Sequence, residues 1–296
     1  MADNPALDSA TPAIAFLLGD ITLARHDNHR RLPAAFRAAG WQVTLLSQEA
    51  VHLGPDGVRL GTEDPTRFDL IWLVGMGRAH TFFDRMQLLR LLPQERFVTT
   101  VDAVVYRHAK YPWWRHMPET HASNDAAYLE SKLAGGGDWI AKPAAGSYGR
   151  DVVRISADAA GAAALDRLTG HGSGQYCLLQ RFVPEIEGGE KRTLVAGGRI
   201  VGSYLRVPGA DLLANLAAGG HPYPTTLTEA EQALVETLAA ELTAIGAGFA
   251  AVDTVFPYLM EVNLVNPGGL ATLESLYGVD YSALVVEALH GWRGIQ

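Results

Sequence analysis

The last third of the chain contains two apolar segments that carry three polar side chains at spacings typical of β-strands. Phe249–Val255 and Leu259–Val262 are separated by a short turn, so they are expected to form a hairpin. Asp253 lies on the first segment, whereas Glu261 and Asn263 lie two residues apart at the end of the second. Side chains two apart in a strand point to the same face. The hairpin therefore places all three oxygen-bearing side chains together on an apolar sheet.

Three oxygen ligands on one face suit a hard divalent cation. Buried carboxylates are costly unless they are paired or bound to a metal, and Mg²⁺ takes oxygen ligands that it shares with nucleotide phosphates. We therefore predict that Asp253, Glu261 and Asn263 bind Mg²⁺, with Mn²⁺ as an alternative ion. A hairpin end with ordinary solvated polar residues accounts equally well for these three residues when they are considered alone.

A strand that ends in lysine precedes a glycine-containing loop. Trp139–Lys142 is expected to form the strand, and the loop after it contains Gly146, Ser147 and Gly149. Glycines permit positive φ angles and close approach of backbone N–H groups to phosphate oxygens, and Lys142 adds a positive charge. The loop lacks the Gly-Lys-Ser/Thr ending of a Walker loop. The loop is a candidate for binding nucleotide phosphates, although an ordinary flexible hairpin loop is the favoured interpretation when these residues are considered alone.

A second segment has the pattern of an adenine-binding linker. Gln180–Glu185 leaves a predicted strand and bends at Pro184. Its backbone N–H and C=O groups are candidates for contact with the edge of an adenine ring, and Phe182 or Val183 is a candidate for packing on the face of the ring. A strand followed by a turn is the alternative interpretation.

Two arginines flank a predicted hairpin. The dipeptide Gly197-Gly198 is typical of a two-residue hairpin turn. Arg192 lies near the start of the first strand and Arg206 near the end of the second, so pairing brings them into one cleft. Two guanidinium groups suit a carboxylate and a developing acyl phosphate, although exposed strand-end charges are the alternative. Asn215 follows a segment that we expect to act as a lid excluding water.

The N-terminal third alternates short apolar segments with helical patterns. The expected elements are strands at Ile14–Leu18, Trp41–Leu46 and Leu70–Val74, with helices at Asn28–Ala39 and Phe82–Leu92. This alternation predicts a doubly wound α/β domain over residues 1–100. Residues 101–296 are expected to form a second domain of two α+β subdomains, 101–175 and 176–296.

Composition excludes several classes of function. The 296 residues are 48% hydrophobic and carry a net charge of −8, which argues for a globular protein whose partners are neither nucleic acid nor a membrane. No apolar run approaches the roughly 20 residues needed to cross a bilayer. Cys177 is the only cysteine, and the first twelve residues lack the basic-then-apolar order of a signal peptide, so we expect a cytoplasmic location. Both a monomer and a homo-oligomer remain open.

The order of these motifs resembles that of the bacterial glutathione synthetases within the ATP-grasp superfamily. The resemblance runs from about Val101 to the C-terminus and is carried by Gly189-Glu190-Lys191-Arg192, Leu205-Arg206-Val207-Pro208, Asn215-Leu216-Ala217-Ala218-Gly219-Gly220 and Glu261-Val262-Asn263. It implies an N-terminal α/β domain that is followed in the sequence by an ATP-grasp fold. It also implies roles for individual residues: Lys110 and Lys142 on ATP phosphates, Gln180, Phe182 and Val183 around adenine, Glu190 at the ribose, Asp253, Glu261 and Asn263 on Mg²⁺, and Arg192, Arg206 and Asn215 at the acyl phosphate and substrate.

The activity implied by this resemblance is an ATP-dependent ligation of a carboxylate to an amine through an acyl phosphate. Its small-molecule substrates would be γ-glutamylcysteine and glycine. Three segments depart from the family's usual pattern, namely Gly75–His80, Gly209–Ala214 and Asn266–Leu270, and all three lie around the expected substrate cleft. A ligase that joins other amino acids, or modifies a peptide or metabolite, is therefore the alternative. A non-catalytic nucleotide-binding regulator is a third interpretation.

Overall fold

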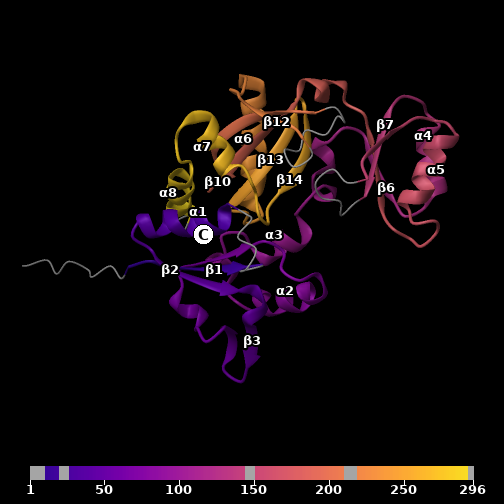
Figure 1. The fold of residues 1–296 in the computed structure, drawn as a ribbon. Helices are drawn as coiled ribbons and strands as arrows, with labels where there is room; N and C mark the ends of the chain where they lie inside the picture. The colour runs from indigo at the N-terminus through magenta and orange to yellow at the C-terminus, as the bar shows by residue number, and fades with distance from the viewer. Residues whose placement is uncertain (1–10, 20–26, 144–150, 210–218, 293–296) are drawn as a thin grey trace, which may run out of the picture.

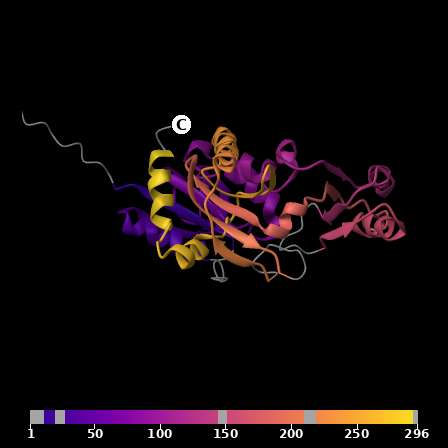
Figure 2. The same ribbon diagram turned by 90° about the horizontal axis from the view of Figure 1, so that it is seen from above.

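The computed structural model describes residues 11–19, 27–143, 151–209 and 219–292 of the chain. Its sheets form three groups, which Figure 1 shows as an N-terminal part below, a large sheet above it and a smaller sheet to the right. Seen from above, the smaller sheet and its helices project to one side of the rest (Figure 2). Within the described ranges, no helix combines the length and apolar character needed to cross a membrane.

The N-terminal part contains a three-stranded parallel sheet in the order β2-β1-β5. Its strands are β1 (Ala13–Leu18), β2 (Gln42–Ser47) and β5 (Leu70–Val74). Every residue of β1 and β5 is buried, which explains their uninterrupted apolar sequences. One face is covered by α1 (Asn28–Ala38) and the other by α2 (Phe82–Arg90) and α3 (Val101–Tyr106). The predicted strands and helices are thus confirmed to within two residues.

A small antiparallel hairpin extends from this part of the molecule. It is formed by β3 (Val51–Gly54) and β4 (Gly57–Leu60), which have no counterpart among the expected elements. Short 3₁₀ turns connect the larger elements: η1 (Gln48–Ala50), η2 (Pro65–Arg67), η3 (Ala79–Thr81), η4 (Gln94–Arg96) and η5 (Tyr111–His116).

A four-stranded antiparallel sheet with the order β6-β9-β7-β8 follows. Its strands are β6 (Thr120–Ser123), β7 (Trp139–Pro143), β8 (Val153–Ile155) and β9 (Cys177–Arg181). Helices α4 (Ala126–Leu133) and α5 (Ala159–Leu168) pack on one face around Trp139. A boundary between residues 175 and 176 would separate β9 from the three strands with which it forms a sheet. We therefore propose that this subdomain ends after β9.

The large sheet is antiparallel, with the order β12-β11-β10-β13-β14. Its strands are β10 (Glu190–Ala196), β11 (Arg199–Val207), β12 (His221–Pro224), β13 (Phe249–Val255) and β14 (Tyr258–Asn263), and η6 (Pro184–Gly188) leads into it. Gly197 and Gly198 both have positive φ, as the predicted hairpin turn between β10 and β11 requires. The predicted terminal hairpin is also present as β13 and β14. One face is covered by α6 (Glu229–Ala244).

The opposite face of the large sheet shares a core with the N-terminal sheet. Helices α7 (Leu270–Tyr277) and α8 (Ser282–Trp292) complete that core, and α8 packs against α1. The ring of Trp72 on β5 stacks on Phe16 at 5.5 Å and meets Phe249 of β13 edge-on at 5.5 Å. Because these rings are buried together, the carboxyl ends of the parallel strands are held beside the terminal hairpin.

Candidate active site

Strand pairing brings the predicted polar residues of the large sheet to one face. Asp253 on β13 is paired with Glu261 on β14 and with Arg192 on β10. Residues that are directly opposite in an antiparallel pair project to the same face. Asn263 lies two residues beyond Glu261 and is paired with Ala251, so it projects to that face as well. The shared face expected for the three oxygen-bearing side chains is therefore present.

Asp253 is buried and binds two arginines at once. Its carboxylate accepts hydrogen bonds from Nε and Nη2 of Arg192, both at 2.7 Å, and contacts Nη2 of Arg206 at 2.8 Å. Burial opposes ionisation of this carboxyl, but the charges of Arg192 and Arg206 outweigh that effect and lower the pKa of Asp253 to about 2. Asp253 is consequently ionised at neutral pH, and both guanidinium groups are drawn to it.

Arg206 has a second carboxylate partner and one unused donor. Its Nη2 also donates to Glu190, which is directly opposite in the pairing of β10 with β11. Arg206 is only 4% exposed, and its Nε has no hydrogen-bond partner among the described residues. A buried donor left unpaired costs about 1–3 kcal/mol, so this N–H favours an incoming acceptor such as an anion.

Lys110 reaches the same face from the segment before η5. Its Nζ lies 2.6 Å from Oε1 of Glu261. The preceding Ala109 has a positive φ of 74°, and its N–H donates to the carbonyl of Val262 at 3.0 Å. This conformation is strained for a residue with a side chain and is held by the contact with β14. The strained residue therefore sets the direction in which Lys110 approaches the sheet.

Lys142 lies on the face of the four-stranded sheet that is turned away from α4 and α5. Its Nζ donates to Oε1 of Gln180 at 2.9 Å, and Nε2 of Gln180 donates to Oγ1 of Thr120 at 2.9 Å. Burial, followed by the neighbouring charge of Lys110, lowers the pKa of Lys142 to about 8, although Glu261 acts in the opposite direction. A buried cation with a neutral hydrogen-bond partner is suited to an anionic ligand.

A cavity of about 190 Å³ opens between the four-stranded sheet and the large sheet. It is lined by Ile140, Lys142, Val152, Arg154, Gln180, Arg181, Phe182, Val183, Ile186 and Met260. The three residues predicted to surround adenine, Gln180, Phe182 and Val183, all belong to this lining. Met260 of β14 was not identified from the sequence. The volume exceeds the roughly 150 Å³ of a cavity that holds one benzene ring, so a flat heterocycle fits.

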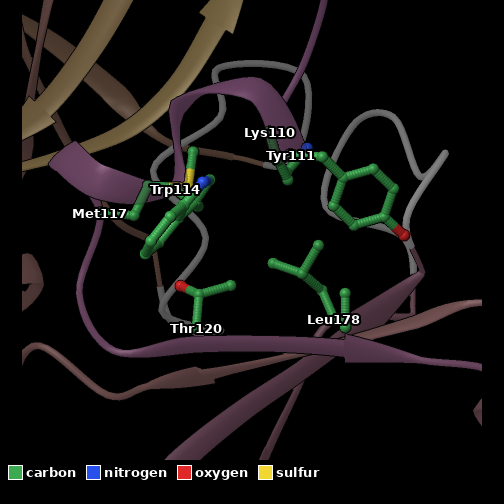
Figure 3. A pocket seen from close by; sticks show the side chains of 7 residues that line it. Lys110, Tyr111, Trp114, Met117, Thr120 and Leu178 are labelled. Atoms are coloured by element: carbon green, nitrogen blue, oxygen red, sulfur yellow. The ribbon is translucent and has the colours of Figure 1, made fainter.

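A second cavity, of about 200 Å³, lies on the other side of the Gln180 and Thr120 side chains. Figure 3 shows Trp114 and Met117 on one side of it, Tyr111 on the other, and Lys110 between them. Its lining is completed by Thr120, Ala122 and Leu178. None of these except Lys110 was identified from the sequence; the aromatic run after Lys110 was the available signal. The hydrogen bonds from Thr120 through Gln180 to Lys142 connect the two cavities.

The loop after β14 joins the charged face to the N-terminal part. The N–H of Gly75 donates to the carbonyl of Val265 at 3.2 Å, and Nδ2 of Asn28 donates to Oδ1 of Asn266 at 2.9 Å. Two of the segments that depart from the family's usual pattern, those beginning at Gly75 and Asn266, are therefore both connected to this junction, since Gly75 bonds the residue before Asn266. Ligands of open α/β sheets commonly bind at the carboxyl ends of the strands, where this junction lies.

The predicted metal ligands fit Mg²⁺ in chemical type, since they offer two carboxylates and an amide oxygen. In this structure each has an internal partner: Asp253 the arginines, Glu261 a lysine, and Asn263 the N–H groups of Val265 and Asn266 at 3.3 and 3.4 Å. Over the described part of the chain, no three His, Cys, Asp or Glu side chains cluster in a metal-binding arrangement. Occupancy by a cation would thus require these carboxylates to change partners.

Four predicted site residues cannot be placed. Gly146, Ser147 and Gly149 of the expected phosphate loop, and Asn215 after the expected lid, lie outside the described residues. The other eleven predicted site residues lie on or beside the four-stranded sheet and the large sheet.

Solved structures of ATP-grasp ligases share this fold. D-cycloserine synthetase DcsG matches with a TM-score of 0.71 at 19% identity, over 95% of this chain and 99% of that one. The ATP-grasp ligase PsnB, complexed with its minimal precursor, matches with a TM-score of 0.69 at 16% identity, over 95% and 99%. A RimK domain protein from Sphaerobacter thermophilus matches with a TM-score of 0.62 at 21% identity, over 94% and 100%. The predicted ATP-grasp fold is thereby confirmed.

Sequence comparison narrows that class. The family model described as prokaryotic glutathione synthetase, ATP-grasp domain, matches residues 108–278, more than half of the chain, and the chain belongs to this family. The glutathione synthetase of Prochlorococcus marinus is 33% identical over 153 residues, which is 51% of this chain and 50% of that protein. The glutathione synthetase of Agrobacterium fabrum is 30% identical over 181 residues, 61% and 57% respectively. The chain thus spans about half the length of the curated relatives it matches.

Proposed function

We propose that the chain is an ATP- and Mg²⁺-dependent ligase that joins a carboxylate to an amine through an acyl phosphate. The observation that carries this proposal is the convergence of four cationic side chains on one cleft beside a cavity of nucleotide-ring size. These side chains are Lys110, Lys142, Arg192 and Arg206. Such a group neutralises the charge of a triphosphate and of a phosphoryl group in transfer.

The nucleotide is proposed to lie between the two sheets. Adenine would occupy the cavity lined by Phe182, Val183 and Met260, with Gln180 at its edge. The phosphates would extend toward Lys142 and Lys110, and the loop with Gly146, Ser147 and Gly149 would supply backbone N–H groups. Glu190 is the candidate for the ribose by family resemblance, although here its carboxylate contacts Arg206.

Asp253, Glu261 and Asn263 would hold Mg²⁺, and Mn²⁺ takes the same oxygen donors. When bound, the ion neutralises phosphate charge and orients the γ-phosphate. Both carboxylates first have to leave the cations that they contact in this structure.

The residues of the chain account for the remaining steps. Arg192 and Arg206 would orient the substrate carboxylate, one oxygen of which attacks the γ-phosphorus of ATP and releases ADP. The amine then attacks the acyl carbon, inorganic phosphate leaves with that carboxylate oxygen, and the amine loses a proton. Asn215 is a further candidate for contact with the acyl phosphate. A closed cleft keeps water from hydrolysing the intermediate.

γ-Glutamylcysteine and glycine are the leading substrates, because the family match covers the ATP-grasp domain and both arginines. A ligase for another acid, amine or peptide is the second candidate. It is favoured by the altered segments at Gly75 and Asn266 on the substrate side, and by the structural likeness to PsnB, which was solved with its minimal precursor. A non-catalytic regulator has less support, since both lysines, both arginines and the three metal-type residues are present.

The test is mass spectrometry of products after incubation with ATP, Mg²⁺, γ-glutamylcysteine and glycine, beside a panel of other acids, amines and peptides. The leading proposal expects ADP, phosphate and glutathione in equal amounts. An ATP-dependent product from the panel alone would replace the glutathione reaction with the second candidate. Nucleotide binding without ADP formation from any pair would support the regulator.

A further inference from the structure

The carboxylate of Asp253 cannot serve the arginine pair and a metal ion in the same arrangement. Three N–H donors of Arg192 and Arg206 already contact its two oxygens within 2.8 Å, and the residue is 2% exposed. A carboxylate has about four acceptor positions, and two adjacent guanidinium charges repel a divalent cation. A cation can therefore reach Asp253 only if the arginines give up part of this contact.

Asp253 correspondingly occupies several of the arginine donors that an anion would use. Arg192 donates from Nε and Nη2 to Asp253, and its Nη1 donates to the carbonyl of Gly268 at 3.3 Å. Arg206 donates from Nη2 to Asp253 and Glu190, and its Nε has no partner among the residues that the structure describes. An anionic substrate has to compete with Asp253 for these donors.

We propose that Asp253 is the internal counter-ion of the arginine pair, and that it releases Arg192 and Arg206 to an anionic substrate when a cation draws its carboxylate away. This inference rests on the proposed function, in which Mg²⁺ enters with the nucleotide. Asp253 thereby acts as a positioning residue that couples the two ligands. Because such coupling is reciprocal, each ligand tightens the binding of the other by the same factor.

Glu190 completes the arrangement. It contacts Arg206 and lies opposite it across β10 and β11, so it holds that guanidinium in the cleft when Asp253 withdraws. Arg192 has the carbonyl of Gly268 as its remaining anchor. The pair therefore stays in place as its counter-ion leaves.

Calorimetric titration with inorganic phosphate, the anion that the proposed reaction releases, tests this coupling. Coupling between sites is commonly 5–150-fold, so saturating Mg²⁺ with ADP should lower the Kd for phosphate at least about 5-fold in the parent protein. Asp253→Asn should bind phosphate at least about 5-fold more tightly than the parent without metal or nucleotide. Loss of a metal ligand alone cannot produce that gain. Asp102→Asn, the same change at an exposed aspartate paired with Arg90, should match the parent.

The second variant is Glu190→Gln, which frees one donor of Arg206 and should also tighten metal-free phosphate binding. Thermal melts establish which variants are folded. Parent-like phosphate affinity in the folded variants without metal would overturn the inference. If Asp253→Asn does not fold, the parent with and without Mg²⁺ and ADP decides the matter, because an unchanged Kd for phosphate would overturn the inference. Failure of ADP to bind the parent would instead count against the proposed function, while the metal-free titrations would still test Asp253.

Discussion

Lys142 is the residue whose ionisation is most sensitive to its surroundings. It is buried, its Nζ donates to a neutral amide oxygen, and Lys110 is a charged neighbour. Its pKa is lowered to about 8, so this lysine is partly neutral at slightly alkaline pH. Phosphate oxygens favour the charged form and should raise that pKa on binding.

Nucleotide affinity is therefore expected to fall as the pH rises above about 8. Below this pKa both free and bound proteins carry the proton, whereas above it binding must take up a proton, and affinity declines by up to about tenfold per pH unit. Calorimetry with ADP, between pH 7 and 9.5 and in buffers of different ionisation enthalpy, measures the decline and the proton uptake. Lys142→Arg should remove both effects, because arginine stays charged. The same pH dependence in that variant would assign the proton to another group.

Glu261 tests the proposed metal site with little risk to the fold. Its side chain is 38% exposed, and the glutamine oxygen can still accept the hydrogen bond of Lys110, so Glu261→Gln should leave the thermal melt close to that of the parent. We expect ADP release at saturating Mg²⁺ to fall at least about 100-fold, the scale for losing a group that stabilises transition-state charge. Near-parental turnover would mean that Glu261 is not needed for the metal. Asp102→Asn serves as the surface control.

The sequence identified which polar side chains share one face of the large sheet, but it did not identify the residues that those side chains contact. Asp253, Glu261 and Asn263 could be placed together because the period of a strand and a short hairpin are local features. The contact of Asp253 with Arg192 depends on the pairing of β10 with β13, which joins residues about sixty apart. No local pattern encodes that pairing. The sequence therefore suggested a metal site, whereas the structure also supplies the internal ion pairs.

At the scale of elements, prediction succeeded where a segment's own pattern determines its structure. The apolar strands of the N-terminal sheet and the glycine turn at Gly197 were found in this way. Pairing partners were harder to predict, since a strand such as β9 shows its burial but not its neighbours. Helices α7 and α8 were not predicted; they are largely apolar and cover a core that forms only when distant segments meet.

Tyr277 links α7 to the edge of the large sheet. Its hydroxyl oxygen lies 2.9 Å from the carbonyl oxygen of Ser203 and 3.0 Å from that of Thr225, which share its single hydrogen, and it accepts the N–H of Thr225 at 2.8 Å. Tyr277→Phe leaves three backbone groups without this partner and should lower the free energy of unfolding by about 1–3 kcal/mol. Urea unfolding measures the change. Tyr106→Phe, at a ring that is 71% exposed, is the control; equal midpoints for both variants would show that the hydroxyl contributes little.

At the scale of the whole molecule, the N-terminal sheet and the large sheet behave as one packed body. Trp72 lies between Phe16 and Phe249, and the three rings belong to a single buried cluster. The four-stranded sheet has its own core around Trp139 and projects to the side (Figure 2). Movement that opens or closes the nucleotide cleft is thus expected between these two bodies rather than within the first.

The shared core predicts that a substitution in it destabilises both sheets. Trp72→Ala removes a fully buried ring and should cost about 3–5 kcal/mol. Because both sheets share that core, they should unfold together. The midpoints of urea unfolding measured by tryptophan fluorescence and by far-ultraviolet circular dichroism should therefore fall to the same lower urea concentration. Hydrogen exchange should lose protection in β1 and β13 alike. Loss confined to β1 would mean that the two sheets unfold independently.

We propose above that a carboxylate in this cleft is activated as an acyl phosphate. The most direct measurement follows the oxygen: a carboxylate substrate labelled with ¹⁸O in both oxygens is converted with ATP, Mg²⁺ and the amine, and the released phosphate is analysed by mass spectrometry. We expect one ¹⁸O atom in each phosphate, because the attacking oxygen remains on phosphorus when the amine displaces it. Amide product formed together with unlabelled phosphate would contradict the acyl phosphate and the role given to the cleft.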